Sequence, residues 1–382
     1  MKKRILIMAH TTDRNLRKRL HEIGSVLGRQ YRVYLFDWHE PVSDTFLYKA
    51  CAGVKDIFRR TCSREEDGRL IAQYPLLHRP LSMVRRSNAY FLERFLMAEK
   101  IDVVINGIHY FLFTPDKKKH NYRHIFDIND IPAEDTQDAL GRFTREFMRH
   151  EARKADVVTA CSNVLVDYAR KNFGRKAEFI PNGTYLEEFQ NMNPERAQAV
   201  KKMYGLSDKF VIGYIGRVGE WIDIDFLLDF FTAVKQRHKT AALLVVGSGP
   251  KVESYKRTVK DRDIIFTGGV PPSEISKYFF CIDVAVLPSK KNFFQDAAFH
   301  IKLIEYTAAQ KMVISTPLEE VVRLGFPNIV LADLDMQVWL DALEKIRSQE
   351  WDKGWNELVK DYDWGVVTRK FTELIERPDG AG

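Results

Sequence analysis

Short apolar runs alternate with longer charged segments along the chain. In the first half the runs cover residues 4–8, 31–36, 101–105, 124–128, 156–160 and 178–180. They are short and rich in valine and isoleucine, which is typical of strands buried on both faces. The charged segments between them, such as residues 13–29 and 144–155, are long enough for crossover helices. This alternation predicts an α/β fold in which helices cover both sides of a parallel sheet.

The second half repeats the pattern, which indicates two domains of similar size. Its runs cover residues 210–215, 242–246, 264–266, 284–287, 312–315 and 328–331. The turn sequence Pro181-Asn182-Gly183 ends the last run of the first half. We therefore expect an N-terminal domain over residues 1–183 and a C-terminal domain over residues 184–357. In the remaining segment, residues 358–382, we expect a helix over 364–376 and place it back against the N-terminal domain. Two Rossmann-like domains of this kind bind ligands at the carboxyl ends of their parallel strands, which here would face a central cleft.

Two basic stretches in the first half, residues 49–69 and 79–100, do not fit this alternation. On both predicted helices the basic residues are mixed with apolar ones, namely Phe58, Met83, Tyr90, Phe91, Phe95 and Leu96. Such a helix either buries its aromatic face in the domain or lies on an anionic membrane. Residues 1–180 carry 33 lysines and arginines against 23 acidic residues, whereas the rest of the chain carries 26 against 29. This imbalance favours contact between the first half and an anionic membrane surface.

Composition narrows the class of protein further. With 45% hydrophobic and 29% charged residues the chain is globular, and no run approaches the roughly 18 apolar residues of a membrane span. The N-terminal segment lacks the apolar stretch and cleavage site of a secretory signal. Four cysteines, Cys51, Cys62, Cys161 and Cys281, have no spacing typical of zinc sites, which indicates a reducing compartment. We expect a cytoplasmic protein that is peripheral at the inner face of the membrane.

The strongest candidate for chemistry lies in residues 296–315. Lys302 and Glu305 are three residues apart, so they are neighbours on one face of a predicted helix, near its N-terminus. A lysine beside the free amide groups of a helix N-terminus can bind a diphosphate. A glutamate one turn later can accept hydrogen bonds from the two hydroxyls of a ribose. A surface ion pair has the same spacing, so the spacing alone leaves both interpretations open.

The sequence around this pair resembles a known family. Lys302-Leu-Ile-Glu305-Tyr306 and the residues up to Pro317 resemble the K-L-x-E-Y-x-A-x-G-x-P-V-x-x-T segment of glycosyltransferases with the GT-B fold. Members of this family have two Rossmann-like domains and take sugars from nucleotide donors. Further similar segments are Pro181-Asn-Gly, Tyr214-Ile-Gly-Arg217, Val246-Gly-Ser-Gly249-Pro and Tyr362-Asp-Trp364. The resemblance covers most of the chain, and it implies the GT-B fold and a nucleotide-sugar donor, a UDP-sugar first of all, with no metal and no cofactor.

The resemblance places the donor mainly on the C-terminal domain. It implies that Arg217 and Lys302 contact the donor diphosphate and that Glu305 contacts the ribose. It also implies Gly249 and Val270 as donor-binding residues.

The chain departs from the family pattern at several positions. Gln310 and Met312 stand where glycine and proline are usual. Ala297 stands eight positions before Glu305, where many retaining members carry a glutamate, and the lysine usual after the loop at Arg217 is absent. The last two departures are similar to the branch of bacterial exopolysaccharide glucuronosyltransferases and teichuronic-acid-type enzymes. Because transfer proceeds with inversion in some members of that branch, the resemblance favours inversion.

Two carboxylates follow the fourth apolar run of the first half. Asp127 and Asp130 lie at a strand end, which is where ligands bind in α/β sheets. Inverting transfer needs a base that takes the proton of the acceptor hydroxyl. The resemblance to the glucuronosyltransferase branch implies that Asp130 is this base and that Asp127 supports it at the acceptor site. A turn cap is the structural alternative for Asp130.

The segment after the first apolar run carries the other candidate acceptor residues. His10 stands at the predicted strand tip, where it could orient an acceptor during catalysis, and the same branch has a similar opening. Arg14 and Arg17 on the next predicted helix could hold a phosphate of the acceptor. Without the resemblance, His10 would be an ordinary polar loop residue.

These features together predict a glycosyltransferase that moves a sugar to a membrane-associated lipid-linked or polysaccharide acceptor. The sequence contains no GxxxxGK[ST], no GxGxxG after the first strand, no GxSxG and no HExxH, which argues against kinases, dehydrogenases, common hydrolases and zinc proteases. One alternative is a sugar-nucleotide epimerase on the same scaffold. The other is a non-catalytic nucleic-acid-binding protein, which is disfavoured because the basic residues are dispersed and no base-stacking motif is present. We therefore expect no nucleic-acid partner.

Overall fold

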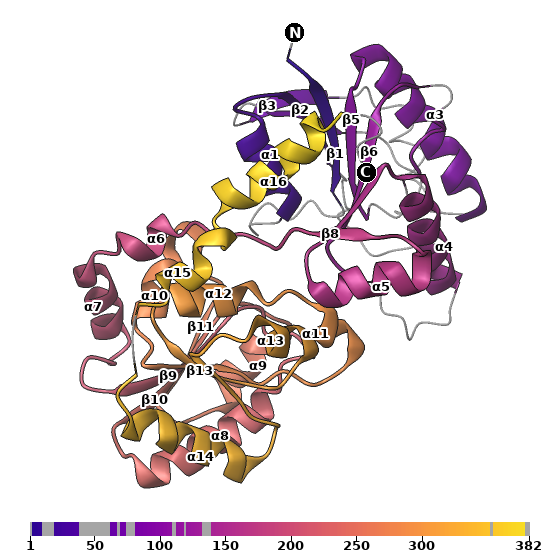
Figure 1. Cartoon of the computed structure of the whole chain (residues 1–382). Helices are drawn as coiled ribbons and strands as arrows, with labels where there is room; N and C mark the ends of the chain where they lie inside the picture. Colours follow the sequence, from indigo (N-terminus) through magenta and orange to yellow (C-terminus); the bar gives the residue numbers. More distant parts are fainter. Residues whose placement is uncertain are drawn as a thin grey trace. The chain divides into compact units, whose positions relative to one another are not determined.

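The computed structural model describes residues 2–9, 19–37, 62–66, 69–73, 81–108, 112–117, 120–131, 139–351 and 354–378. The chain divides into two compact units (Figure 1). Unit 1 consists of Met1–Asn182 and Trp364–Gly382, and unit 2 consists of Gly183–Asp363. The first division thus lies next to the expected boundary at residue 183. The second follows Asp363 rather than residue 357, because the last helix begins only at Trp364.

Unit 1 contains a sheet with the order β3-β4-β2-β1-β5-β6-β7-β8. The described strands are β1 (Arg4–Ala9), β2 (Arg32–Asp37), β3 (Cys62–Glu66), β4 (Arg69–Gln73), β5 (Val103–Gly107), β6 (Arg123–Ile128), β7 (Val157–Ala160) and β8 (Ala177–Phe179). All neighbours are parallel except β3 and β4, which pair antiparallel. The six strands predicted for this half are confirmed.

Of the stretch 49–69, for which a helix was predicted, the structure describes residues 62–66 and 69, and these lie in the strands β3 and β4 instead. The strand β3 has the sequence Cys-Ser-Arg-Glu-Glu, which lacks an apolar run and therefore gives no strand signal. An edge strand can form on such a sequence because its backbone needs a partner on one side only. Phe58 lies outside the described residues.

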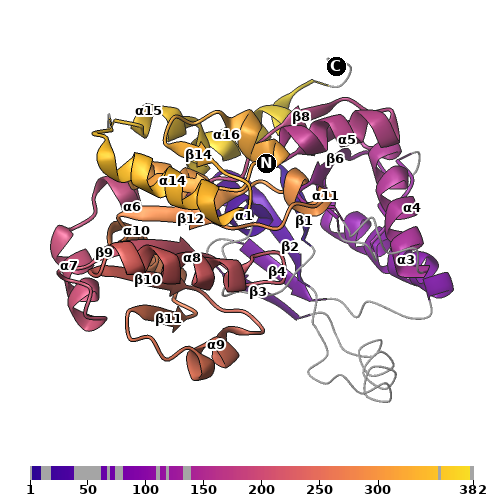
Figure 2. The same cartoon turned by 90° about the horizontal axis from the view of Figure 1, so that it is seen from below.

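Helices cover the unit 1 sheet on both sides (Figure 2). They are α1 (Arg19–Leu27), α3 (Leu81–Glu99), α4 (Ala139–Lys154), α5 (Asn163–Phe173) and α16 (Trp364–Glu376). The ends of α5 follow from its sequence: the Ser162 side chain caps the first turn, and Gly174 ends the helix with a φ of 65°. The helix α16 has the predicted bounds and packs against α1 within unit 1.

The second basic stretch forms α3 and divides its side chains between the core and solvent. Phe95 and Leu96 belong to a buried cluster with strands β1, β2 and β5. Tyr90 and Met97 are 55% and 62% exposed. The helix therefore buries one apolar face and leaves two large apolar side chains in solvent. The side chains of Met83 and Phe91 lie outside the described part of the chain.

Unit 2 contains a parallel sheet with the order β11-β10-β9-β12-β13-β14. Its strands are β9 (Phe210–Ile215), β10 (Ala241–Val246), β11 (Ile264–Gly268), β12 (Val284–Leu287), β13 (Met312–Ser315) and β14 (Ile329–Leu331). The principal helices are α6 (Glu187–Gln190), α7 (Pro194–Met203), α8 (Ile224–Arg237), α9 (Val252–Thr258), α10 (Ser276–Phe280), α11 (Phe293–Ala297), α12 (Ile301–Ala308), α13 (Glu319–Leu324), α14 (Met336–Ser348) and α15 (Asn356–Val359). All six strands predicted for this half are confirmed: the central strands β9, β10, β12 and β13 are almost entirely buried, whereas the edge strands β11 and β14 are partly exposed.

Each sheet has a point at which the strand order reverses. In unit 1 the chain builds β2 on one side of β1 and later places β5 on the other. In unit 2 β10 and β12 flank β9 in the same way. Ligands of α/β proteins bind at the carboxyl ends of the strands at such points. Of the helices that the structure describes, none is long and apolar enough to cross a membrane.

Candidate donor and acceptor sites

The predicted donor residues all follow strands of unit 2 on the carboxyl side or lie on α12. Arg217 comes two residues after β9, Gly249 three residues after β10, and Val270 two residues after β11. Lys302 and Glu305 lie on the first two turns of α12. The structure thus gathers the predicted donor set in one unit, at and beside the point where its strand order reverses.

Lys302 reaches from α12 to the end of β9. Its Nζ donates a hydrogen bond of 2.9 Å to the Tyr214 hydroxyl and lies 4.6 Å from the centre of that ring. Gly216 leaves room for the ammonium group, since a Cβ at this position would lie 2.7 Å from Nζ. Burial lowers the pKa of Lys302 to about 8, and the charge of Glu305 opposes this shift. Lys302 is therefore a half-buried cation whose charge depends on its immediate neighbours.

Glu305 lies one turn after Lys302 and is also half-buried. One of its carboxylate oxygens accepts a hydrogen bond of 3.3 Å from the Thr184 hydroxyl. The carboxylate is therefore held from a segment that precedes the sheet of unit 2, while part of it remains accessible.

The loops after β9 and β10 pack against each other through their backbones. The Val218 amide donates to the Ser248 carbonyl at 2.9 Å. A Cβ on Gly249 would overlap the Val218 carbonyl, so only glycine allows this close approach. Val270 is half-buried in the loop after Gly268, which has a φ of 82°. The loops after β9, β10 and β11 thus present mainly backbone groups, and the exposed Arg217 side chain extends from the first of them.

In unit 1 the end of β6 places Asp127 and Asp130 in different surroundings. Asp127 is fully buried, and its carboxylate accepts hydrogen bonds from both ends of the Arg19 guanidinium at 2.8 and 2.9 Å. The Thr159 hydroxyl donates to the same carboxylate at 2.7 Å. Asp127 is thus enclosed by protein, so it supports the strand end rather than contacting an acceptor directly.

Asp130 lies two residues beyond β6 and is exposed. Its carboxylate accepts a hydrogen bond of 2.8 Å from the Ile131 amide, which is the local turn contact considered above as an alternative role. The protein packed around the carboxyl group raises the pKa of Asp130 to about 6, and the hydrogen bond opposes this shift. A carboxylate of this kind is ionised at neutral pH and still basic enough to accept a proton.

Comparison with known proteins decides the family. Residues 19–188 match the family described as "Glycosyltransferase Family 4", and residues 209–349 match the one described as "Glycosyl transferases group 1". The two matches fall on the two units and together include most of the described residues. The chain belongs to the GT-B glycosyltransferases of the GT4 type.

Curated relatives of this glycosyltransferase are similar over part of their length. A putative teichuronic acid biosynthesis glycosyltransferase, TuaH of Bacillus subtilis, is 25% identical over 64% of this chain and 65% of the relative. A GDP-mannose-dependent α-(1-6)-phosphatidylinositol monomannoside mannosyltransferase of Mycolicibacterium smegmatis is 28% identical over 38% of this chain and 40% of the relative. The chain thus matches less than two thirds of the length of these relatives.

A solved structure confirms the fold over almost the whole chain. A glycosyltransferase from Rickettsia africae superimposes with a TM-score of 0.71 at 16% identity, covering 98% of each chain. The predicted fold class, GT-B with two Rossmann-like domains of parallel strands, is therefore confirmed.

The three predicted residues before the first helix lie outside the described residues. His10, Arg14 and Arg17 precede Arg19, where the description of α1 begins. Among the residues that the structure describes, no cluster of three or more histidine, cysteine or carboxylate side chains could hold a metal ion.

Sequence reasoning missed two residues that contact the predicted set. Arg19 shares one face of α1 with the buried Ile23 and Leu27, and an arginine on such an apolar stripe was the available signal. Tyr214 is a hydroxyl-bearing residue inside a fully buried strand, where a hydroxyl normally has a partner.

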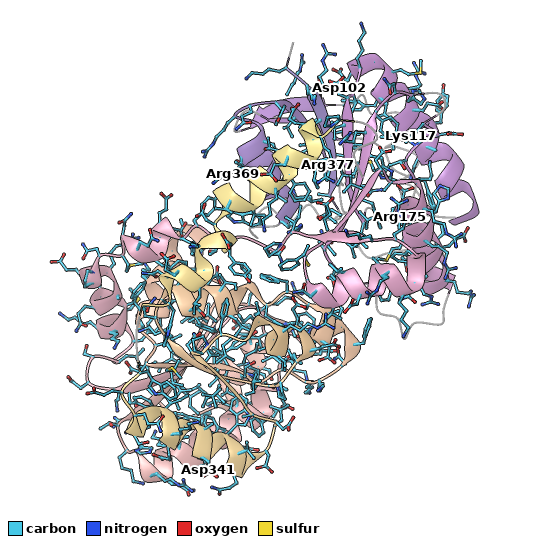
Figure 3. The ribbon with its side chains drawn as sticks, in the orientation of Figure 1. Asp102, Lys117, Arg175, Asp341, Arg369 and Arg377 are labelled. Carbon is cyan, nitrogen blue, oxygen red and sulfur yellow. The ribbon has the colours of Figure 1, made fainter. Side chains whose placement is uncertain are left out.

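A cavity of about 1180 Å³ lies in unit 1 at the amino ends of β5 to β8 and contains none of the predicted residues. It is rimmed by ion pairs: Lys3 with Glu376, Lys117 with Asp156, and Arg377 with Glu178. Asp102, Lys117 and Arg377 are labelled in Figure 3. Asp102, Arg123 and Lys176 also line the cavity, so charged groups of both signs surround it.

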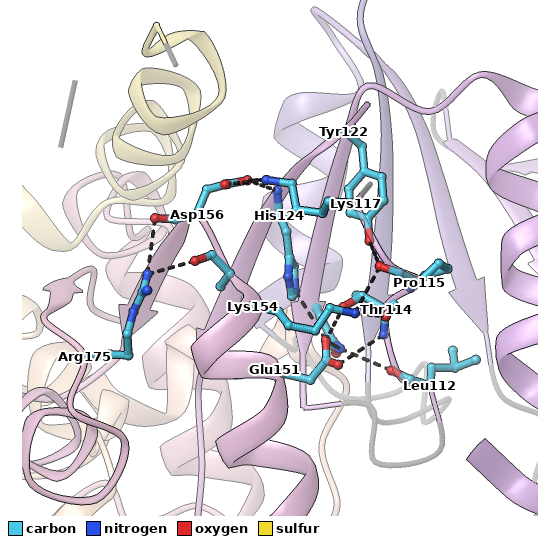
Figure 4. Close-up of polar contacts among 12 residues, drawn as sticks. Leu112, Thr114, Pro115, Lys117, Tyr122, His124, Glu151, Lys154, Asp156 and Arg175 are labelled. Atoms are coloured by element: carbon cyan, nitrogen blue, oxygen red, sulfur yellow. Dashed lines mark hydrogen bonds and ion pairs between the residues drawn. The ribbon is translucent and has the colours of Figure 1, made fainter. Parts of the chain in front are cut away.

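A buried polar network lies beside this cavity (Figure 4). Glu151 of α4 accepts hydrogen bonds from the Thr114 amide at 3.1 Å, the Thr114 hydroxyl at 2.7 Å and the Asn106 side chain at 3.1 Å. Burial raises the pKa of Glu151 to about 7 and lowers that of the adjacent His124 to about 3. These bonds hold the segment after β5 against α4, which is a structural task.

Proposed function

We propose that the protein transfers a sugar from a nucleotide-sugar donor, held by unit 2, to a membrane-associated acceptor held by unit 1. The observation that carries the proposal is the Lys302 ammonium at the glycine-containing loop after β9 in a chain of this family. The acceptor is a lipid-linked or polysaccharide molecule. Nothing observed favours the sugar-nucleotide epimerase or the nucleic-acid-binding protein.

On the donor side, two cations would offset the charge that develops on the leaving diphosphate. Lys302 of α12 is charged below about pH 8, and Arg217 extends from the loop after β9 into solvent. Fixed positive groups at the leaving diphosphate lower the barrier to transfer. Glu305 would accept hydrogen bonds from the ribose hydroxyls, and Gly249 and Val270 would line the rest of the nucleotide site. The proposal includes no metal ion and no cofactor.

On the acceptor side, Asp130 would act as the general base. The acceptor hydroxyl oxygen attacks the anomeric carbon, the bond to the diphosphate breaks, and the hydroxyl proton passes to Asp130. This direct displacement inverts the anomeric carbon, which agrees with Ala297 in the place of a glutamate. His10 would orient the acceptor, and Arg14 and Arg17 would hold its phosphate.

The membrane contact would involve α3 at the inner face of the cytoplasmic membrane. Tyr90 and Met97 are exposed on this helix, and the Arg94 guanidinium lies 5.8 Å from the centre of the Tyr90 ring. Exposed aromatic and basic side chains on one helix suit the interface of an anionic bilayer. The mycobacterial relative, whose name gives a phosphatidylinositol mannoside as substrate, supports a lipid acceptor.

A thermal-shift screen of UDP-, GDP-, ADP- and TDP-sugars tests the proposed function. A ligand that binds the native state stabilises it by RT ln(1 + [L]/Kd), so the unfolding temperature rises with ligand concentration. We expect one nucleotide class to raise the midpoint, UDP-sugars first, and the Lys302→Ala variant to lose the shift. If none of the four classes raises the midpoint at millimolar concentration, the proposal of a nucleotide-sugar donor is wrong.

A further inference from the structure

Packing alone does not explain why residue 214 is a tyrosine, because an apolar side chain could fill the same space. It lies in β9, the central strand of unit 2, and it is fully buried. Its neighbours in the strand are apolar or glycine, and the strand itself needs no side-chain hydroxyl for its pairing. The hydroxyl group of Tyr214 therefore requires a separate explanation.

The hydroxyl links the Lys302 ammonium to the backbone of the loop that carries Arg217. It donates a hydrogen bond of 2.8 Å to the Arg217 carbonyl, which turns its oxygen lone pairs toward Lys302. It accepts a hydrogen bond of 2.9 Å from the Lys302 ammonium. One buried oxygen atom thus connects the loop that carries Arg217 with the side chain of Lys302.

We infer that Tyr214 is a positioning residue for donor binding, whose hydroxyl keeps the Lys302 ammonium charged and held at the loop of Arg217. The inference rests on the proposed function, in which these two residues bind the donor diphosphate. A hydrogen bond to the charged form of a group favours that form. A lysine amine that has lost its proton would no longer attract a diphosphate.

The groups around Lys302 explain why the Tyr214 hydroxyl affects the charge of its ammonium group. Burial lowers the pKa of Lys302 to about 8, and Glu305 on the same helix counteracts this. His300 at the start of the helix is buried, with its pKa lowered to about 4, so it is neutral at physiological pH. Tyr214 is the acceptor presented by β9, and its own pKa is raised well above the ordinary value by burial, so it keeps its proton.

Tyr306 provides a matched control. Like Tyr214, it is fully buried in unit 2, and its hydroxyl contacts the same strand. That hydroxyl, however, accepts a hydrogen bond of 2.7 Å from the Ile215 backbone amide rather than from Lys302. Tyr214→Phe and Tyr306→Phe thus remove equivalent atoms, and only the first removes a partner of the ammonium group. Both variants keep the aromatic ring and most of its packing.

The first measurement is the titration of Lys302 by NMR in full-length protein with 13C-labelled lysine, with no nucleotide present. The Lys302 signal is identified by its loss in Lys302→Arg. We expect a midpoint near pH 8 in the unaltered protein and a downward shift of about one pH unit in Tyr214→Phe. Tyr306→Phe should titrate like the unaltered protein. An equal midpoint in Tyr214→Phe and Tyr306→Phe would overturn the inference.

The second measurement is calorimetric titration with UDP and with GDP at pH 6.5 and pH 8.5. If only the charged lysine binds the diphosphate, a shift of one unit makes Tyr214→Phe about eightfold weaker than the unaltered protein at pH 8.5 and less than twofold weaker at pH 6.5. A structural defect would weaken binding equally at both pH values, which would contradict the inference. Unchanged affinity in Lys302→Ala would instead contradict the proposed donor site, whatever the NMR titration of Tyr214→Phe shows.

Discussion

At the level of single residues, the proposed donor binding relies on two charged groups, Lys302 and Glu305, that are partly buried. If these residues bind the nucleotide as proposed, each would lose water on binding and would have to regain its hydrogen bonds from the ligand. Hydrogen bonds between the ligand and these half-buried groups would therefore contribute more to the binding free energy than contacts with an exposed lysine of the same unit, such as Lys345 on α14.

We predict that Lys302→Ala and Glu305→Ala each weaken nucleotide-sugar binding about ten- to a hundredfold, which corresponds to roughly 1.5–3 kcal/mol. The first variant removes the cation from the diphosphate, and the second removes the acceptor of the ribose hydroxyls. Calorimetric titration with the donor found in the screen measures both. Lys345→Ala is the control and should bind normally. Unaltered affinity in both site variants would refute the assignment of these residues.

A second prediction at this scale concerns pH. Asp130 must be ionised to accept a proton, and its pKa of about 6 means that activity rises as the pH increases through 6. Lys302 must be charged, so activity falls as the pH increases through 8. The pH profile of kcat/KM should therefore be bell-shaped, with limbs near these two values.

Asp130→Asn tests the acidic limb. The amide keeps the shape of the side chain but cannot take the proton, so turnover should fall about a hundredfold or more while donor affinity stays nearly unchanged. Asp127→Ala serves as a comparison in which loss of stability, rather than loss of a base, limits activity. Retained turnover in Asp130→Asn, or a product with the anomeric configuration of the donor, would exclude an inverting base at this position.

At the level of elements, the end of β6 is held by one buried ion pair. Arg19 of α1 binds Asp127 with two hydrogen bonds, donates to the Pro181 carbonyl at 2.5 Å and lies 5.4 Å from the centre of the Phe371 ring of α16. One guanidinium thus connects α1, β6, the last turn of the first half and the C-terminal helix. Tertiary contacts of this kind also fix where the loop with Asp130 begins.

We predict that Arg19→Ala lowers the free energy of unfolding of unit 1 by about 3–5 kcal/mol, because Asp127 then remains buried without a counter-charge. Arg170→Ala on α5 is the matched control, since its ion pair with Asp167 is exposed and should contribute less than about 1 kcal/mol. Urea unfolding followed by circular dichroism measures both. A similar small effect for the two variants would show that the pair does not hold the strand end.

At the level of the whole molecule, the uneven charge of the chain supports the proposed contact with an anionic membrane. The excess of basic residues lies in residues 1–180, while the remainder is slightly acidic. Long-range attraction by an anionic surface would therefore act on unit 1 and present α3, with its exposed Tyr90 and Met97, to the lipid.

We predict that the protein binds vesicles containing phosphatidylserine or phosphatidylglycerol and that binding weakens as salt increases from about 0.05 to 0.5 M. Replacement of Arg85, Arg86 and Arg94 by glutamine should release most of the protein while its unfolding transition stays unchanged. Replacement of Arg237, Lys239 and Arg262 in unit 2 removes the same charge and should have little effect. Equal binding to neutral and anionic vesicles in co-sedimentation would contradict the proposal.

The sequence by itself determined the order of strands and helices and the family. The twelve predicted strands are visible as short apolar runs because most of them bury side chains under covering helices, and the K-L-x-E-Y segment marks the unit that we propose binds the donor. The sequence did not predict the hairpin β3–β4, because an edge strand can form by backbone pairing without an apolar run. The sequence predicted that the last helix returns to the first domain, but it placed the second division at residue 357 rather than after Asp363, since the segment before the helix carries no periodicity.

Only the tertiary structure decided which side chains share an environment. Tyr214 and Lys302 are 88 positions apart, and Arg19 and Asp127 are 108 apart, so no spacing along the chain indicates that they meet. Spacing also could not tell Asp127 from Asp130, two carboxylates on one strand end. Packing separates them, because it encloses the first with Arg19 and Thr159 and leaves the second outside this contact, beyond the end of β6. Burial and partners set the charge and accessibility of each group, and both arise only when distant segments pack together.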